Sequence, residues 1–167
     1  TTERTLGQDH KSTLISAHNL AGLYVSQGRY SEAEKLFLRG LAAAERSLGR
    51  EHRHTLHYVN NLAGLYHSQG RYDEAERLSL RALEARELTL GKEHLDTLLS
   101  VNTLACLRES QGQEKEAEAL YLRALKTNER ILGKEHPHSL TASNNLAGLY
   151  KSQGRHEEAE ALYLRKI

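Results

Sequence analysis

Apolar residues recur along this chain at the three- and four-residue spacing of an amphipathic helix. In the best-defined stretch, one apolar stripe is followed by a short polar break and then by a second stripe. The first consists of Leu56, Val59, Leu62, Ala63 and Tyr66, and the second of Ala75, Leu78, Ala82 and Ala85. This periodicity predicts a helix that runs to about Gln69 and a second helix that ends near Leu90.

Short polar breaks separate the predicted helices. Gly70 follows the first helix, at the position where a chain that leaves a helix through a left-handed conformation needs glycine. Asp73 and Glu76 have the spacing of a capping box that would begin the second helix. Ser31 and Glu34 have the same spacing one unit earlier. Each unit is therefore predicted to be helix, tight turn, helix and short loop, and the fold class is all-α.

The helix pair recurs with a fixed period, because Gly28, Gly70, Gly112 and Gly154 stand 42 residues apart. Such a period predicts an array in which each pair buries its apolar face against its neighbours. The predicted divisions are the end of a preceding repeat helix (1–9), three repeats (10–51, 52–93 and 94–135) and a fourth repeat truncated in its second helix (136–167). All are expected to form one solenoid domain, cut from a longer array.

Charge and composition argue against several classes of partner. The chain has 23 basic and 22 acidic residues, and both signs are mixed along its length. Nucleic acids and anionic membrane surfaces require clustered Lys and Arg, so neither is expected as a partner. Cys106 is the only cysteine, and no apolar run approaches the roughly 18 residues of a membrane span. We therefore expect a soluble, cytoplasmic protein.

No motif in the chain indicates catalysis or a bound cofactor. Zinc-binding spacings of His and Cys are missing, and so is a glycine-rich loop that would hold phosphate. Cys106 has no basic neighbour in sequence that would activate its thiol. Four histidines recur in the loop before each first helix, where we expect them to cap helices or pack between units: His10, His52, His94 and His136. The sequence therefore predicts no metal, no cofactor and no enzymatic activity.

Small and aromatic residues stand at set offsets within each unit. In the second unit they are Leu62, Ala63, Tyr66, Gly70, Ala75 and Ala82. This order resembles the tetratricopeptide repeat, and the 42-residue period with its LGxxH loop resembles the kinesin light chain type of that repeat. The resemblance covers essentially the whole chain. It implies a right-handed superhelical solenoid of stacked antiparallel helix pairs.

Several positions depart from the repeated pattern. Arg108 stands where the other units have tyrosine, and Lys115 stands at the predicted cap position of the third unit. Ser79 replaces an aromatic residue, and Gly40 stands at the position of Ala82. Because the third unit is the least regular, we expect either a local distortion there or a polar contact made by Arg108.

The resemblance implies that the first helices line a concave groove along which an extended peptide lies. Carried over to this chain, it places two lines of polar residues in the groove: His18, Asn60, Asn102 and Asn144, with Asn19, Asn61 and Asn145 beside them. An amide both donates and accepts, so a ladder of amides can bind a peptide backbone. The alternative is that these amides bond within the protein and only hold the stack together.

Two further lines are expected on the same face. The third consists of Gly22, Gly64, Cys106 and Gly148, and the fourth of Val25, His67, Glu109 and Lys151. Glycine inside a helix costs about 1 kcal/mol relative to alanine, so its recurrence favours either a deep groove or close helix packing. The fourth line varies from unit to unit inside a repeated frame, and we expect it to influence selectivity.

These features favour a non-catalytic protein–protein interaction scaffold that binds a peptide or protein segment in the groove, adaptor-like as in kinesin light chain cargo binding. A clamp for the carboxylate of a chaperone C-terminus is not expected, because such a clamp requires Lys or Arg at set positions of the groove. At one of these positions the successive repeats have Ile15, His57, Leu99 and Thr141. The alternatives are a structural array that self-associates head to tail and a ligand-sensing repeat region of a larger signalling receptor.

Overall fold

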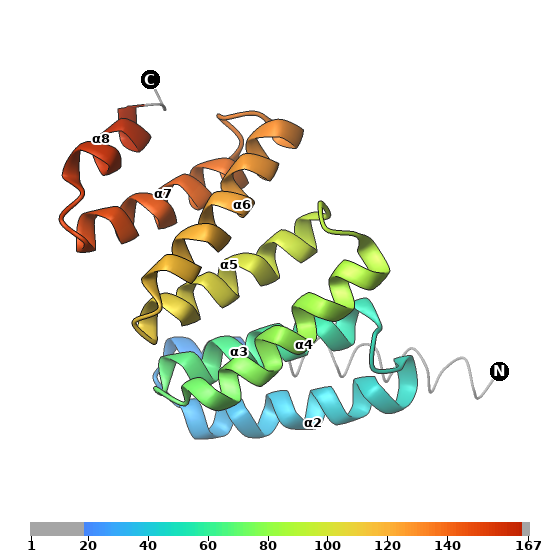
Figure 1. Cartoon of the computed structure of the whole chain (residues 1–167). Helices are drawn as coiled ribbons and strands as arrows, with labels where there is room; N and C mark the ends of the chain where they lie inside the picture. Colours follow the sequence, from blue (N-terminus) through green and yellow to red (C-terminus); the bar gives the residue numbers. More distant parts are fainter. Residues whose placement is uncertain (1–18, 165–167) are drawn as a thin grey trace. The chain divides into compact units, whose positions relative to one another are not determined.

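The computed structural model describes residues 19–164, which form helices joined by short turns (Figure 1). A helical segment over residues 19–26 precedes α2 (Tyr30–Leu48), α3 (Arg53–Ser68), α4 (Tyr72–Leu90), α5 (Leu95–Ser110), α6 (Glu114–Leu132), α7 (Pro137–Ser152) and α8 (His156–Leu164). No strand occurs within this range. The predicted ends of the first and second helices, near Gln69 and Leu90, are confirmed. The repeat end predicted over residues 1–9 lies outside the described residues.

Helices that follow one another in the chain pack against one another. The chain forms two compact units, residues 1–85 and 86–167, with the boundary inside α4. In the first unit α2 packs on α3, and in the second α6 packs on both α5 and α7, while α7 packs on α8. Alanines allow the close approach of these helices, and the fully buried ones include Ala33, Ala63, Ala105, Ala117 and Ala147.

The turn inside each helix pair depends on glycine, as predicted. Gly70 has a φ of 75°, a left-handed conformation that costs other residues a clash with their own Cβ. This conformation lets the backbone N–H of Arg71 donate to the carbonyl of Tyr66 at 2.8 Å. The bond satisfies a carbonyl at the end of α3, which the helix itself leaves without a donor.

The capping boxes predicted at the second helices are wrong. The helix α2 begins at Tyr30, and the residue before it, Arg29, makes no side-chain capping bond. The helix α4 begins at Tyr72, so Ser31 and Asp73 are each the second residue of a helix rather than the residue before it. Both helices begin earlier than predicted, and in α2 a single non-helical residue, Arg29 with a φ of −88° and a ψ of 65°, separates Gly28 from the first helical residue.

Three of the repeated histidines cap first helices, which is one of the two roles expected of them, and His10 lies outside the described residues. The Nδ1 atoms of His52, His94 and His136 accept hydrogen bonds from backbone N–H groups two residues ahead, at 3.1–3.2 Å. In the same loop, the hydroxyl of Thr97 donates to the carbonyl of Gly91 at 2.7 Å. Thr55 makes the equivalent bond to Gly49. The loops before α3 and α5 are therefore each held to the following helix by two side chains.

Substituting a capping histidine should weaken the array by a predictable amount. We expect His94→Ala to lower the free energy of unfolding by about 1 kcal/mol, because a backbone N–H at the start of α5 loses its acceptor. His94→Asn should retain most of that stability, since asparagine is a good N-cap residue. Urea unfolding followed by circular dichroism measures both values. Equal losses in the two variants would show that the imidazole acts through packing instead.

Adjacent repeats are joined by a carboxylate that binds two groups of the next helix pair. Glu34 on α2 accepts from the hydroxyl of Tyr66 at 3.1 Å and from Arg71 Nη1 at 2.9 Å. Glu118, Tyr150 and Arg155 form the same arrangement in the second unit. Burial raises the pKa of the Tyr66 hydroxyl, and the neighbouring carboxylate of Glu34 raises it further.

Arg108 makes polar contacts, which is one of the two outcomes expected for the third unit. Its Nη1 atom donates to Gln113 Oε1 at 2.9 Å, and its Nε atom lies 3.3 Å from Glu116 Oε2. In the second repeat (52–93), Arg71 provides the guanidinium and stacks on Tyr66 at 4.1 Å. The second and third repeats therefore place the guanidinium on different residues. The helix α5 nevertheless keeps the same 16-residue length as α3.

Candidate functional site

One face of each first helix carries the residues predicted to bind a partner. On α3 these are Asn60, Asn61, Gly64 and His67, whose spacing places them on one side of the helix. Residues on the opposite side, such as Leu62 and Tyr66, are buried in the core. We call the side with the asparagines and glycines, together with the equivalent positions of the segment 19–26, α5 and α7, the first-helix face.

The asparagines of this face differ in how accessible they are. Asn60 is only 8% exposed, whereas Asn144 and Asn19 are exposed and Asn61, Asn102 and Asn145 are half-buried. The buried Oδ1 atoms of Asn60 and Asn102 accept no hydrogen bond from the described residues. The alternative in which these amides only bond within the protein is therefore not supported for those two oxygens. His18 lies outside the described residues.

The glycines of the first-helix face are not required by close helix packing. A Cβ built at Gly22, Gly64 or Gly148 would meet no atom within 4 Å beyond its own helix. Gly40 on α2 is the contrasting case, since a Cβ there would lie 2.6 Å from Cε1 of Tyr58. The first three glycines therefore leave open space next to the helix, which costs helix propensity without improving packing.

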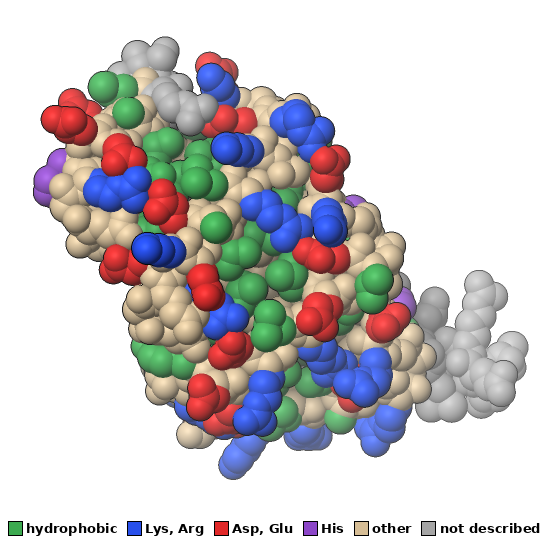
Figure 2. All heavy atoms as spheres, viewed as in Figure 1, with side chains coloured by type: hydrophobic (Ala, Val, Ile, Leu, Met, Phe, Trp, Pro, Cys, Tyr) green, Lys and Arg blue, Asp and Glu red, His purple; other side chains and the backbone are tan. Residues whose placement is uncertain are grey.

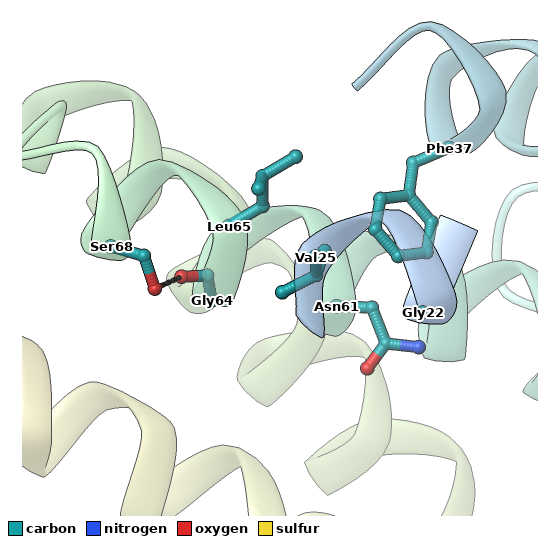
Figure 3. A pocket seen from close by; sticks show the side chains of 7 residues that line it. All are labelled: Gly22, Val25, Phe37, Asn61, Gly64, Leu65 and Ser68. Atoms are coloured by element: carbon teal, nitrogen blue, oxygen red, sulfur yellow. Dashed lines mark hydrogen bonds between the residues drawn. The ribbon is translucent and has the colours of Figure 1, made fainter. Parts of the chain in front are cut away.

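In the first unit this open space belongs to a pocket of about 250 Å³. It is lined by Gly22, Val25, Phe37, Asn61, Gly64, Leu65 and Ser68, which come from the segment 19–26, α2 and α3 (Figure 3). Phe37 and Leu65 are buried and form its apolar part. The hydroxyl of Ser68 donates to the carbonyl of Gly64 at 3.1 Å. None of the lining residues carries a charge.

In the second unit the equivalent positions are occupied by polar side chains. Counting 84 residues on from Gly22, Val25 and Phe37 gives Cys106, Glu109 and Tyr121. The Tyr121 hydroxyl lies 2.8 Å from Glu109 Oε2 and 3.2 Å from Cys106 Sγ. A single hydroxyl proton serves only one of them, so Tyr121 donates to Glu109 and accepts from the thiol of Cys106.

This arrangement leaves the thiol of Cys106 unreactive. Burial raises the pKa of Cys106, and the nearby carboxylate of Glu109 raises it further. Burial and the contacts with Cys106 and Glu109 also raise the pKa of Tyr121. Because the thiolate is the nucleophilic form, this cysteine has no feature of a catalytic group.

The remaining candidates on the first-helix face are accessible but differ in chemistry. Gly148 and Lys151 are exposed on α7, and His67 is half-buried on α3. The ring of His67 lies 5.8 Å from that of Tyr72. Three of the residues that line the pocket, Phe37, Leu65 and Ser68, were not among those predicted to bind a partner. A pocket formed by three helices leaves no periodic signal in the sequence, so these residues could not be found there.

The described residues contain no group of three or more His, Cys, Asp or Glu side chains that could hold a metal ion. The paired histidines of the loops instead stack on each other, as in His52 and His54 at 5.3 Å. No helix in the described part of the chain is both long and apolar enough to cross a bilayer. Acidic and basic side chains are interspersed over the face seen in Figure 2, with apolar side chains between them.

Comparison with known proteins gives matches along the whole chain. The family model described as tetratricopeptide repeat matches residues 1–46, 12–77, 52–129 and 109–165. A kinesin light chain-like protein of Podosopora anserina with nearly identical TPR-like repeats is 31% identical, with a TM-score of 0.81. The match covers 92% of this chain and 72% of that one. No curated protein matches the chain.

Two further solved structures are similar. BtubC (BKLC) from P. vanneervenii is 25% identical with a TM-score of 0.77, over 90% of this chain and 60% of that one. This chain thus spans less than two thirds of that protein's length. The apo form of RapI, 14% identical with a TM-score of 0.74 over 95% of this chain and 42% of that chain, shares the fold alone. The predicted all-α class of stacked helix pairs is confirmed by these matches.

Proposed function

Because the chain belongs to the tetratricopeptide repeat family, we propose that it is a scaffold that binds an extended segment of a partner protein along its first-helix face. Repeats of this family generally serve protein–protein interaction, and the fold is typically non-catalytic. The observation that supports this face in particular is the open space beside Gly22, Gly64 and Gly148. Packing does not require glycine there, so its cost in helix propensity favours a binding role.

The amides on this face suit the backbone of an extended segment. Asn61 and Asn145 occupy equivalent positions of α3 and α7, and each is half-buried rather than enclosed. An amide bonds a peptide backbone through both its donor and its acceptor, whatever side chains the peptide carries. The side chains one turn further, His67 and Lys151, differ between repeats and would add preferences for particular residues.

Peptides selected from a random displayed library test this proposal. Their affinity, measured by fluorescence anisotropy, should fall in the double variant Asn61→Ala, Asn145→Ala by about fivefold for each hydrogen bond lost. The matched control is Lys35→Ala, Lys126→Ala, which alters exposed residues of the second helices α2 and α6. Loss of binding in the control together with unchanged binding in the asparagine variant would contradict the proposal. It would indicate that peptides bind to the second helices instead.

Kinesin light chain-like cargo binding is the adaptor role that we propose, in the cytoplasm, on the basis of the similarity to kinesin light chain-like repeats. Head-to-tail self-association stays a prediction, which light scattering over a range of protein concentrations checks.

A further inference from the structure

We propose that three positions decide whether the space between neighbouring first helices admits a side chain of the bound segment. Gly22, Val25 and Phe37 keep it open in the first unit, and Cys106, Glu109 and Tyr121 close it in the second. The open pocket then selects an uncharged apolar side chain. This inference rests on the proposed function, because it names the kind of segment that the first-helix face binds.

The open state follows from the small size of Gly22 and from the apolar character of Val25 and Phe37. Gly22 has no side chain, and a Cβ there would meet nothing within 4 Å. Phe37 ends in a ring carbon where Tyr121 carries a hydroxyl, so it has no polar atom that could bridge to α3 or to the segment 19–26. Figure 3 shows the ring of Phe37 next to the helix that carries Gly22 and Val25, with Leu65 and Asn61 projecting from α3.

The closed state follows from a chain of hydrogen bonds. Cys106 supplies a side chain where the first unit has none, and the Tyr121 hydroxyl reaches both its sulfur atom and the carboxylate of Glu109. Tyr121 is 1% exposed, so its hydroxyl could not be satisfied by bulk solvent and needs these partners. The three side chains therefore hold one another in the space that is empty in the first unit.

The chemistry of the pocket identifies its occupant. Its lining contains no charge, and Phe37, Val25 and Leu65 provide apolar contact, while Ser68 directs its proton to the backbone of its own helix. A charged side chain would lose its hydration there without a partner. An engineered cavity of roughly 150 Å³ holds benzene, so a pocket of about 250 Å³ accommodates a leucine- or phenylalanine-sized group. The occupant is accordingly an apolar side chain of a partner segment.

Indole titrated into 15N-labelled protein tests the proposal without any peptide. In the wild-type chain, saturable amide shifts are expected at Gly22, Asn61 and Gly64, and indole-5-carboxylate should leave the same amides unchanged. In the variant Cys106→Gly, Glu109→Val, Tyr121→Phe, a second set of shifts is expected at Asn145 and Gly148. Shifts distributed without preference for these residues, or no second set in a folded triple variant, would overturn the proposal.

The variant Gly22→Ala provides a second test, which does not depend on whether the triple variant folds. The added methyl group meets no atom of a neighbouring helix and favours the helix, so the variant should be at least as stable as the wild type. It reduces the apolar space, and indole affinity should fall about fourfold or more. Unchanged affinity in this variant would contradict the assignment of the pocket, whatever the triple variant does.

The two hypotheses fail in different ways. If indole binds as described but selected peptides bind independently of Asn61 and Asn145, the pocket exists and the proposed scaffold face is wrong. If the peptides depend on both asparagines but indole shifts no amide near Gly22, the face is right and the apolar anchor is wrong.

Discussion

Replacing Arg86 by alanine is expected to lower the free energy of unfolding by about 3 kcal/mol, more than any single surface change. Arg86 is 1% exposed although it carries a charge. Its Nη1 atom donates to Ser100 Oγ at 2.7 Å and to the carbonyl of Asp96 at 3.1 Å. Alanine would remove both donors and leave a cavity between α4 and α5. Urea unfolding monitored by circular dichroism measures the loss.

Arg81 provides the matched control, because it is an arginine of the same helix one and a half turns away. It forms an ion pair with Glu45 at 2.7 Å, but its side chain is 23% exposed. Partly exposed ion pairs of this kind contribute about 0–1 kcal/mol, so Arg81→Ala should cost far less than Arg86→Ala. Similar losses in both variants would contradict the importance assigned to burial.

A second large effect is expected at Gly40, which departs from the alanine that the second and third repeats have at this position. A Cβ at this position would lie 2.6 Å from Cε1 and 2.8 Å from Cζ of Tyr58. Gly40→Ala should therefore lower the free energy of unfolding by about 1–3 kcal/mol, despite the better helix propensity of alanine. Thermal unfolding by calorimetry compares the variant with the wild type.

The double variant Gly40→Ala, Tyr58→Ser separates the clash from any other cause. Ser100 occupies the position equivalent to Tyr58 and Ala82 that equivalent to Gly40, so the double variant introduces the two residue types that stand at these positions one repeat later. We expect the coupling energy of the double-mutant cycle to be stabilising by 1 kcal/mol or more, in the range of about 0.5–3 kcal/mol measured for residues in contact. A coupling near zero would show that Tyr58 moves aside without cost.

The contact of Arg86 between a second helix and the next first helix recurs one repeat later at Asn128. Arg86 donates to the carbonyl of Asp96, and Asn128 donates from Nδ2 to the carbonyl of His138 at 3.5 Å. Each donor and each acceptor is offset from its counterpart by one repeat period. The size of the side chain changes between repeats, while the carbonyl that receives its proton stays the same. The side-chain volume that the second helix contributes to this interface therefore differs between these two repeats.

Much of the fold was predictable from local pattern. The helical period of the apolar residues, the glycines at the turns and the recurrent histidines act over a few residues of chain. Helix ends near Gln69 and Leu90 and the capping by His94 were therefore correct. The capping boxes at Ser31 and Asp73 were wrong because the same spacing also occurs inside the first turn of a helix. Whether a Ser or Asp at this spacing caps the helix depends on the residue at which the preceding turn ends.

The sequence by itself determined the all-α repeat, its period and the face on which the recurrent asparagines and glycines lie. It left open whether Gly22 and Gly64 serve packing or leave space, and it did not distinguish Phe37 from Tyr121, an aromatic residue at the equivalent position. Only the tertiary structure decided both points, because the space beside a glycine is defined by atoms of other helices. The hydroxyl of Tyr121, for example, forms its hydrogen bonds with Cys106 and Glu109, which belong to another helix. That contact between α5 and α6 arises from packing, which the repeat period alone does not encode.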